Sequence, residues 1–493
     1  MKILLIYPEF PVTYWSFKHV LKLISKRATE PPLGLITVSS MLPEKWEKRL
    51  VDMNIRKLRD RDLLWADMVF ISGMSVQRAS FEAAVLRCNA LGVKVVAGGP
   101  MVTGRHEDFS GIDHFVLNEA EITLPQFLDD LAEGKAGKVY SATGFADVET
   151  TPAPDWSLLE MKHYVTMDLQ YSRGCPFNCD FCNITALFGH RPRMKSASRF
   201  IAELDSLHSA GWRGSVFIVD DNFIGNKRIL KTELLPALIS WQKEHSFPFS
   251  FNTEVSINLA DDEELMDGMS AAGFDSCFVG IETPEDIGLD ECGKMQNRGR
   301  DMVASVKILQ RKGFKVAGGF IVGFDSDNDT IFEKQYNFIQ KSGIVSAMVG
   351  LLNAPYGTPL YKRLDKENRI IKGISGDNTD GSLNFVSRMD SDFLRFGYRK
   401  LVQKIYSPGT YFDRIKTFLS EYRMPQVRLN SDWRSDFKTA VKVILRLGFF
   451  QSRGKWYFWK LLGHTMMNCP EKITIALTMA VYGLHFRKIA DSI

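Results

Sequence analysis

Three cysteines, Cys175, Cys179 and Cys182, lie within eight residues of one another. Thiolates are soft ligands, and three of them in one short segment select either zinc or an iron–sulfur cluster. A structural zinc site needs a fourth Cys or His ligand, and His190 follows the last cysteine closely enough to supply it. The alternative is a 4Fe–4S cluster held by three thiolates, which leaves one iron free to bind a reactant.

The other cysteines are scattered along the chain. Seven cysteines in 493 residues are too few for a disulfide framework, so we expect free thiols and a reducing, cytoplasmic location. Cys88, Cys277 and Cys469 are expected to be small buried side chains, whereas Cys292 could be an additional thiol near the site. No stretch reaches the roughly 18 charge-free apolar residues of a membrane span.

The cysteines follow an apolar run that opens a series of alternating strands and helices. The expected strands are 167–171, 215–220, 249–255, 276–282, 316–324 and 347–353. Helical patterns occupy 199–210, 263–272, 302–312 and 330–342. Six such units predict a partial (β/α)6 barrel over residues 166–375, with its active site at the carboxyl ends of the strands. The cysteine segment follows the first strand, which places it at that rim.

A separate α/β domain is predicted over residues 1–145. Its expected strands are 2–7, 49–53, 68–72, 94–97 and 114–117, and its expected helices are 35–42, 79–91 and 124–131. This alternation predicts a doubly wound, Rossmann-like parallel sheet with ligand-binding loops at the carboxyl ends of its strands. Residues 146–165 contain Pro152 and Pro154 and are expected to be a stiff linker.

Residues 376–493 are predicted to be a helical domain. The expected helices are 391–406, 410–423, 432–447 and 472–482. Residues 401–493 carry 15 Lys and Arg against 6 Asp and Glu, a net charge of +9. A basic region can attract an anionic membrane surface, although solvated helix faces are the commoner explanation. Aromatic and cationic residues alternate over 449–460, which suits either a membrane interface or a helical core.

The Cys-x3-Cys-x-aromatic-Cys spacing after the first strand of a partial barrel resembles the radical S-adenosylmethionine (SAM) superfamily. The resemblance implies that Cys175, Cys179 and Cys182 hold a 4Fe–4S cluster whose free iron binds SAM. An electron from the cluster then cleaves SAM to methionine and a 5′-deoxyadenosyl radical. By the same resemblance, Phe181 would lie against the adenine, and Gly174 would let the loop turn tightly around the cluster.

Other strand ends fit the same resemblance. Asp220 and Asn222 follow the second barrel strand, where the family contacts the SAM amino group. Glu254 lies on the third strand and Glu282 ends the fourth, where contacts to ribose and carboxylate are usual. Each carboxylate could instead be a helix cap or an ion-pair partner.

The N-terminal domain resembles the cobalamin-binding domains fused before radical SAM barrels. The shared features are the Pro-Pro-Leu-Gly-Leu segment at 31–35, a Gly-Gly-Pro loop and a Glu-x-Glu loop. The mutase signature with a cobalt-binding His is absent, because Asp113 and His114 continue as Phe-Val-Leu. Asn118 replaces the family's usual glycine before the Glu-x-Glu pair, and a domain that keeps the fold without the cofactor is the alternative. The implied cobalamin contacts are Ser72, Met74, Ser75, Gly98, Gly99, Pro100 and Glu119.

Over the whole chain the resemblance is to the subfamily with an N-terminal cobalamin-binding domain and a helical C-terminal extension, which includes the hopanoid methylases. Segments 324–327, 352–355 and 482–488 carry this narrower likeness. It implies a radical SAM enzyme that methylates an unactivated carbon of a small-molecule or lipid substrate, with methylcobalamin delivering the methyl group and a second SAM recharging the cobalt.

Two alternatives to methylation remain open. One keeps the radical step but ends in cyclisation, carbon–carbon coupling or rearrangement. The other is a non-catalytic metal- or cobalamin-binding module. An electron donor such as flavodoxin or ferredoxin is the expected protein partner, nucleic acid is not expected, and the basic C-terminal region could contact a membrane peripherally. No sequence motif identifies the substrate.

Overall fold

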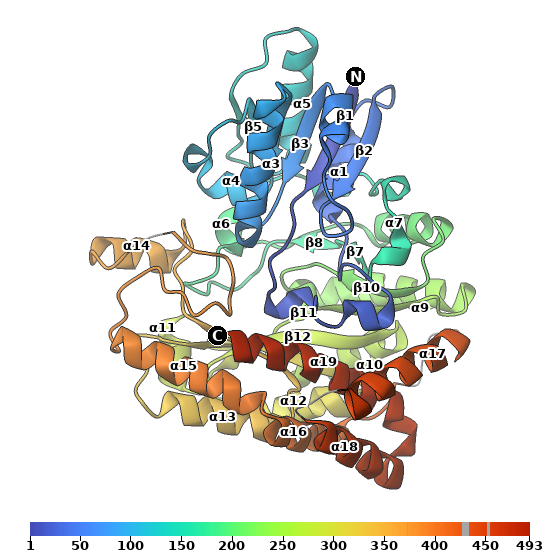
Figure 1. Ribbon diagram of the computed structural model, residues 1–493, viewed down its shortest axis with the longest axis vertical. Helices are drawn as coiled ribbons and strands as arrows, with labels where there is room; N and C mark the ends of the chain where they lie inside the picture. Colours follow the sequence, from blue (N-terminus) through green and yellow to red (C-terminus); the bar gives the residue numbers. More distant parts are fainter. Residues whose placement is uncertain (372, 426–432, 451–453) are drawn as a thin grey trace.

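The computed structural model describes residues 1–371, 373–425, 433–450 and 454–493. Figure 1 shows an α/β domain at the top, a curved sheet with its helices in the middle and a group of helices at the bottom. The two large sheets have six strands each, and all pairings within them are parallel. This architecture confirms the predicted fold class.

The N-terminal sheet has the strand order β2-β1-β3-β4-β5-β6. Ile3 and Leu5 of β1 pack on one face, and Leu4 and Ile6 pack on the other, so β1 is a continuous apolar run. The order reverses between β1 and β3, where doubly wound sheets form a ligand-binding crevice. The two-residue strand β6 was not predicted. The strands are β1 (Lys2–Tyr7), β2 (Glu47–Asp52), β3 (Met68–Ser72), β4 (Lys94–Gly98), β5 (His114–Val116) and β6 (Val139–Tyr140).

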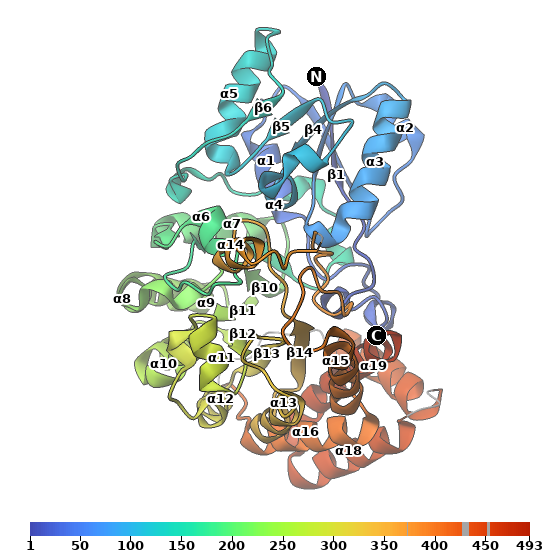
Figure 2. The ribbon, with the colours of Figure 1, turned by 90° about the vertical axis from the view of Figure 1, so that its left-hand side faces the viewer.

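Helices cover both faces of this sheet (Figure 2). The α-helices are α1 (Leu33–Met41), α2 (Asp60–Trp65), α3 (Arg78–Ala90), α4 (Pro100–Gly104) and α5 (Ala120–Ala132). The short helical turns are η1 (Tyr14–Ser16), η2 (Leu21–Ile24), η3 (Ser75–Gln77) and η4 (His106–Asp108).

The barrel sheet has the order β14-β13-β12-β11-β10-β7 and stays open between its edge strands β14 and β7. Phe249, Phe251 and Val255 of β11 pack against the surrounding helices, so alternation turns Asn252 and Glu254 toward the barrel interior. The strands are β7 (Met167–Leu169), β10 (Gly214–Ile218), β11 (Phe249–Val255), β12 (Phe274–Glu282), β13 (Lys315–Val322) and β14 (Ser346–Leu351). A separate antiparallel pair consists of β8 (Ser172–Arg173) and β9 (Arg193–Met194).

The helical elements of the barrel follow its strands. The α-helices are α6 (Ile184–Phe188), α7 (Ala197–Ser209), α8 (Lys227–Ile229), α9 (Leu235–Glu244), α10 (Glu263–Ala271), α11 (Asp286–Glu291), α12 (Met302–Arg311), α13 (Ile331–Ser342) and α14 (Pro359–Lys366). The remaining turns are η8 (Phe223–Asn226), the π-helical η9 (Leu230–Leu234), η10 (Ile257–Asp261) and η11 (Met295–Asn297).

Two segments connect the N-terminal domain with the barrel. The chain between β1 and α1 leaves its own domain, and Trp15 packs on Phe278 of β12 with ring centroids 5.7 Å apart. Residues 146–165 form the turns η5 (Val148–Thr150), η6 (Trp156–Leu158) and η7 (Met161–His163). The amide of Asp155 donates to the Ile36 carbonyl, and the Trp156 indole donates to Ser206 at 3.0 Å. This segment is therefore packed against both domains.

The C-terminal helices lie beneath β13 and β14, beside α13 (Figure 2). Arg414 is fully buried, and its Nη1 donates to Gln340 of α13 and to the Ile405 carbonyl. The predicted helices are present, but the last one extends to Ser492, and α18 was not predicted. Among the described helices none is long and apolar enough to cross a membrane. The elements are α15 (Ser391–Ile405), α16 (Pro408–Glu421), α17 (Trp433–Ile444), the π-helical η12 (Leu445–Phe449), α18 (Lys455–Asn468), η13 (Pro470–Lys472) and α19 (Ile473–Ser492).

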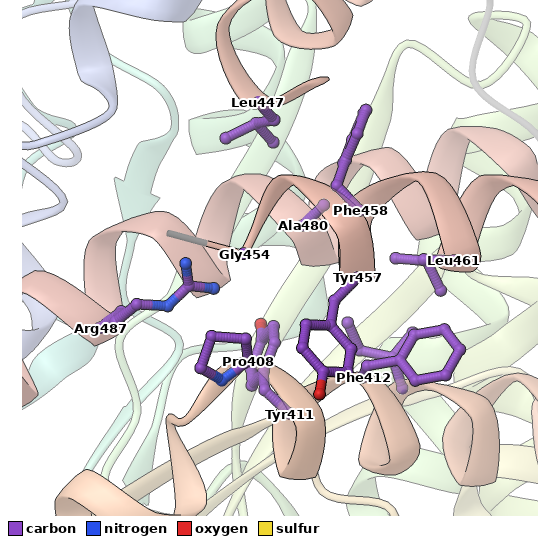
Figure 3. Close-up of a pocket in the computed structure, with 11 residues that line it drawn as sticks. Pro408, Tyr411, Phe412, Leu447, Gly454, Tyr457, Phe458, Leu461, Ala480 and Arg487 are labelled. Atoms are coloured by element: carbon purple, nitrogen blue, oxygen red, sulfur yellow. The ribbon is translucent and has the colours of Figure 1, made fainter. Parts of the chain in front are cut away.

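A small hollow lies among α16, α18 and α19 (Figure 3). Its volume of about 30 Å³ gives room for roughly one water molecule. Tyr411, Tyr457 and Phe458 line it together with apolar neighbours. It is a packing gap between helices and too small for a substrate.

Candidate functional site

The cysteine loop runs from β8 to α6 at the carboxyl-terminal rim of the barrel. Cys179 is buried, Cys175 and Cys182 are half-buried, and all three are free thiols. The Cys175 amide donates to the Gly189 carbonyl, and the Cys182 amide donates to the Cys179 carbonyl at 3.1 Å. In the part of the chain that the structure describes, no three His, Cys, Asp or Glu side chains are grouped as ligands of a single ion.

Gly174 gives the loop its entry turn. Its φ of +94° lies in the left-handed region, which glycine adopts without steric cost. A Cβ at this position would stand 3.0 Å from the carbonyl oxygens of both Gly189 and Phe188. The tight turn predicted for Gly174 is therefore confirmed.

Burial raises the pKa of each of the three thiols, that of Cys182 to about 12. The Lys294 ammonium opposes this rise at Cys175 and Cys179. Metal ligation requires the thiolate form, so these side chains need further positive charge to ionise. The irons of a cluster would provide it, and the donor set therefore fits a 4Fe–4S cluster.

Asp220 and Asn222 lie at the end of β10, and both brace neighbouring backbone. The Asp220 carboxylate accepts from the Tyr171 amide at 2.8 Å and from the Ser172 hydroxyl at 2.6 Å. The Asn222 Oδ1 accepts from the Ser256 amide at 3.2 Å. Both oxygens of Asp220 are thus engaged in tying β10 to the segment before the cysteines.

Asp221, which the sequence did not single out, faces the cysteine loop. Its Oδ2 accepts from the Gly174 amide at 3.3 Å, and its charge raises the pKa of Cys175 and Glu254. Burial raises the pKa of Asp221 itself to about 6. Asp220 and Asp221 have the same side chain and are neighbours in the sequence. Their different contacts follow from the direction of the backbone at the end of β10.

Glu254 and Glu282 come from neighbouring strands and face the same space as the cysteines. Glu282 has a φ of +64° at a register shift of β12, a strained conformation of the kind that clusters at functional sites. Its Oε1 pairs with Lys294 at 2.5 Å, and both side chains are nearly buried. Burial raises the pKa of Glu254 to about 8, and Asp221 adds to this rise. The sequence allows Lys294, after the fourth barrel strand, to be either a rim residue or a helix cap, and the structure pairs it with Glu282.

Phe181 lies in the cysteine loop, and its ring centroid is 6.5 Å from that of Phe324, which follows β13. It packs on a cluster that includes Cys292, whose side chain is 1% exposed. Cys88 and Cys277 are buried as predicted, whereas Cys469 is only half-buried. His190 is exposed on the surface.

A cavity of about 520 Å³ lies between the N-terminal sheet and the barrel rim. Most of the residues expected to contact cobalamin line it, together with side chains of α1, β7 and the segment before the cysteines. Ser75 does not; it starts η3 and lies against the Gly376 backbone instead. The expected residues on the cavity wall are Ser72, Met74, Gly98, Gly99, Pro100 and Glu119.

The cavity wall of the N-terminal domain needs small residues. A Cβ on Gly98 would stand 2.8 Å from the Val116 carbonyl oxygen, and a Cβ on Gly99 would overlap the Ser72 hydroxyl. Asn118 has a φ of +61°. This left-handed conformation explains the family's glycine, and Asn is among the few other residues that adopt it routinely.

A buried charge network joins this wall to the cysteine loop. Arg173 pairs with Glu119 at 2.9 Å and with Glu121 at 2.7 Å, and Arg193 pairs with Glu119 at 2.9 Å. Burial alone would raise the pKa of Glu121, but the hydrogen bonds and charge of Arg173 hold it at about 2. Because Arg173 is two residues before Cys175, the network links the two halves of the site.

Two family models match the chain: the Radical SAM superfamily over residues 169–339 and a Domain of unknown function (DUF4070) over residues 358–493. A relative described as an uncharacterized methyltransferase of Synechocystis sp. is 38% identical over 491 residues, 99% of this chain and 91% of the relative. The hopanoid C-2 methylase of Rhodopseudomonas palustris is 32% identical over 418 residues, 84% of this chain and 78% of the relative.

Two solved structures share the architecture along the whole chain. One is OxsB, a cobalamin-dependent SAM radical enzyme with aqua-cobalamin bound, with a TM-score of 0.63 at 13% identity over 99% of this chain and 80% of that chain. The other is the radical SAM methyltransferase TsrM from Kitasatospora setae with cobalamin and a 4Fe–4S cluster bound, with a TM-score of 0.63 at 13% identity over 97% of this chain and 99% of that chain. At this identity the likeness shows the fold.

The radical SAM family model covers the three cysteines, and the two sequence relatives are a methyltransferase and a methylase. These matches favour a 4Fe–4S cluster over a Cys3His zinc site. This chain is an enzyme that belongs to the radical SAM superfamily, in the subfamily with an N-terminal cobalamin-binding domain and a helical C-terminal extension that includes the hopanoid methylases.

Proposed function

We propose that the protein methylates an unactivated carbon of its substrate with a 4Fe–4S cluster, SAM and cobalamin. The observation that carries the proposal is the cavity that the expected cobalamin residues share with Asp168, Gln170 and Arg173, the residues that lead into the cysteine loop. When bound, the cluster and SAM supply a 5′-deoxyadenosyl radical, and methylcobalamin supplies a methyl group taken from a second SAM. The methyltransferase descriptions of the two sequence relatives support this reaction over cyclisation or rearrangement.

The chain's own residues take three roles in this proposal. Cys175, Cys179 and Cys182 hold the cluster. Asp221, Glu254 and the Glu282–Lys294 pair present charges to the amino acid and ribose parts of SAM, with Phe181 beside the adenine. Asp220 and Asn222 position the strand end that carries Asp221, since their own oxygens are engaged.

The rim of the site is covered by the loop after β14. The Asn384 side chain accepts from the Ala354 amide at 2.9 Å and donates to the Ala354 carbonyl at 2.7 Å. Between α14 and Asn384, Gly376 approaches the backbone of Ser75 and Val76. This loop therefore closes the space between the barrel and the N-terminal domain, which helps to exclude water from radical chemistry.

Anaerobic reconstitution with iron, sulfide and cobalamin tests this function. We expect an absorption spectrum of a 4Fe–4S protein, retained cobalamin, and formation of 5′-deoxyadenosine from SAM under reducing conditions. Cys179→Ala should abolish the cleavage, whereas Cys469→Ser, which changes a half-buried thiol in the C-terminal helices, is the control with intact activity. SAM labelled in its methyl group, incubated with the lipid and metabolite extract of a strain that lacks the gene, should transfer label to product. Cleavage that survives Cys179→Ala would contradict the cluster assignment.

The proposal includes a lipid substrate and contact with a membrane surface. Residues 437–468 contain no Asp or Glu, and exposed Lys438, Lys442, Arg446, Lys455 and Lys460 accompany an apolar face. Aromatic side chains combined with cations suit an anionic lipid interface. The exposed apolar residues are Phe437, Val441, Leu445, Phe449, Phe450, Trp456, Tyr457, Trp459, Met466 and Met467.

Vesicle sedimentation tests the membrane contact. The variant Phe449→Ser/Phe450→Ser/Trp456→Ser should bind vesicles of phosphatidylcholine and phosphatidylglycerol more than about tenfold more weakly, because each buried aromatic contributes about 1.5–3 kcal/mol. The matched control Leu64→Ser/Leu86→Ser changes two other exposed apolar residues and should bind as the wild type does. Equal binding by both variants would refute the contact.

A further inference from the structure

A buried carboxylate without a partner lies in the wall of the large cavity. Asp168, in the middle of β7, is 4% exposed and lines the cavity. Its Oδ1 atom has no hydrogen-bond partner among the residues that the structure describes. Buried polar atoms in folded proteins are almost always hydrogen-bonded, so an unpaired carboxylate oxygen on a residue that lines a cavity points to a donor group supplied by a ligand.

The fold brings a second carboxylate beside Asp168. The amide of Val165 donates to the Ala28 carbonyl, and the amide of Thr166 donates to the Thr29 carbonyl at 3.0 Å. These bonds align the chain before α1 with the chain that enters β7. Glu30 therefore lies next to the start of β7, and its side chain lines the same cavity. Glu30 is exposed to the cavity, and within the described part of the chain no hydrogen bond or ion pair holds its side chain.

The cations of the cavity wall are already paired. Arg173 is held by Glu119 and Glu121, and Lys195 binds Glu203 at 2.6 Å. In the described ranges of the chain, no cation of the cavity wall therefore pairs with Glu30 or Asp168. Glu30 is exposed to the cavity, and desolvation by the surrounding protein raises its pKa to about 7. Burial together with the nearby Glu30 charge raises that of Asp168 far above its usual range.

The pair lies in the same cavity as the expected cobalamin residues. The charge of Glu30 also raises the pKa of Glu254, which faces the cysteine loop and the proposed SAM site. Glu30 leads into α1 of the N-terminal domain, and burial together with the charges of Asp52, Glu30 and Asp168 raises the pKa of Tyr7 at the end of β1. A substrate that is to receive a methyl group must occupy this space, since both reactants must reach one of its carbons.

We propose that Glu30 and Asp168 form a substrate-binding subsite that takes a hydrogen-bond-donating group, a hydroxyl or a protonated amine, of an otherwise apolar substrate. This inference rests on the proposed function. A pair of carboxyl groups offers several acceptor oxygens to an ammonium or hydroxyl group, and a bound ammonium favours the ionised form of the carboxyl groups. Holding that group fixes which carbon of the substrate faces the SAM pocket, so the subsite determines the position of reaction.

The test uses the full chain reconstituted with cluster and cobalamin. Anaerobic calorimetry measures the affinity for three ring compounds of equal size: cyclohexylamine, cyclohexanol and methylcyclohexane. Wild type should bind the amine or the alcohol at least tenfold more tightly than methylcyclohexane. Asp168→Asn and Glu30→Gln, which keep side-chain shape, should each remove most of that preference. Glu285→Gln, a carboxylate outside the cavity, is the matched control and should retain it.

Three results would overturn the subsite. Equal affinity of wild type for all three compounds shows that no donor group is recognised, and unchanged preference in both variants shows that the pair is not responsible. Loss of cobalamin affinity in the variants, measured by absorption, assigns the pair to the cofactor. Failure of the proposed function would give a different result. A wild-type protein that binds no cobalamin would refute the proposed methylation, whereas the presence of the Glu30–Asp168 subsite would still be decided by the preference for the amine or the alcohol.

Discussion

Arg173→Met removes the cation that connects the two halves of the site. Glu121 is 8% exposed and would lose its partner, while Glu119 would keep Arg193 alone. The pKa of Glu121 is lowered from 4.5 to about 2, which at about 1.4 kcal/mol per pKa unit corresponds to roughly 3 kcal/mol of stabilisation. Removing one partner of a buried pair costs roughly 3–5 kcal/mol. We therefore expect the free energy of unfolding to fall by about 3 kcal/mol at pH 7.

The sign of the pH dependence follows from the direction of this shift. A carboxyl with a lowered pKa stabilises the fold fully above its unfolded value of about 4.5. That contribution is lost as the pH falls from there through about 2. The difference between wild type and Arg173→Met should therefore be constant near neutral pH and shrink in acid.

Anaerobic urea denaturation followed by circular dichroism measures this difference, and absorption titration measures cobalamin affinity. The control is Arg369→Met, because Arg369 pairs with the nearly buried Asp325, whose pKa is also held at about 2. Both variants should lose stability, but only Arg173→Met should also weaken cobalamin binding and iron retention. A loss below about 1 kcal/mol for Arg173→Met, or equal cofactor losses in both variants, would refute the reasoning.

Three further changes test single features of the site. Gly174→Ala should prevent iron incorporation, because the new Cβ would meet two carbonyl oxygens. The control Gly211→Ala has the same φ of +94° but open space around its Cβ, and it should retain iron. Equal iron content in the two variants would contradict the role of the tight packing around Gly174. Gly99→Ala should weaken cobalamin binding by about tenfold or more in an absorption titration, since its Cβ overlaps the Ser72 hydroxyl, and unchanged affinity would disprove the role of this loop. Lys294→Met should weaken SAM binding at least about tenfold in equilibrium dialysis, because it leaves Glu282 buried without its cation. Wild-type affinity of this variant for SAM would exclude the Glu282–Lys294 pair from the SAM site.

The secondary structure and the cysteine loop could be predicted because they depend on local pattern. Lys2–Tyr7 and Phe249–Val255 are runs rich in apolar residues, and Cys175 follows the first barrel strand at a spacing that few folds use. Even the replacement of the family's glycine by Asn118 has a local reason, its φ of +61°. These features need no knowledge of which segments meet.

The partners of the polar side chains could not be predicted in the same way. Asp220 and Asp221 are adjacent and chemically identical, and only the backbone direction at the end of β10 turns Asp220 to the Ser172 hydroxyl and Asp221 to the Gly174 amide. Glu30 is remote in sequence from Asp168 and is brought beside it by backbone pairing. Such contacts depend on how the two domains pack together, and the periodicity of apolar residues in the sequence does not predict that packing.

That docking explains why residues 146–165 are more than a spacer. Asp155 bonds to the Ile36 carbonyl of α1, and Trp156 bonds to Ser206 of α7, so the segment fixes the N-terminal domain to the barrel. Because β7 leads from this segment into the cysteine loop, a shift of the N-terminal domain would move Asp168 and Cys175 together. A reaction that passes between two bound cofactors needs a fixed distance between them. Residues 146–165, packed against both domains, can hold the two cofactor sites at a fixed distance, whereas a flexible linker could not.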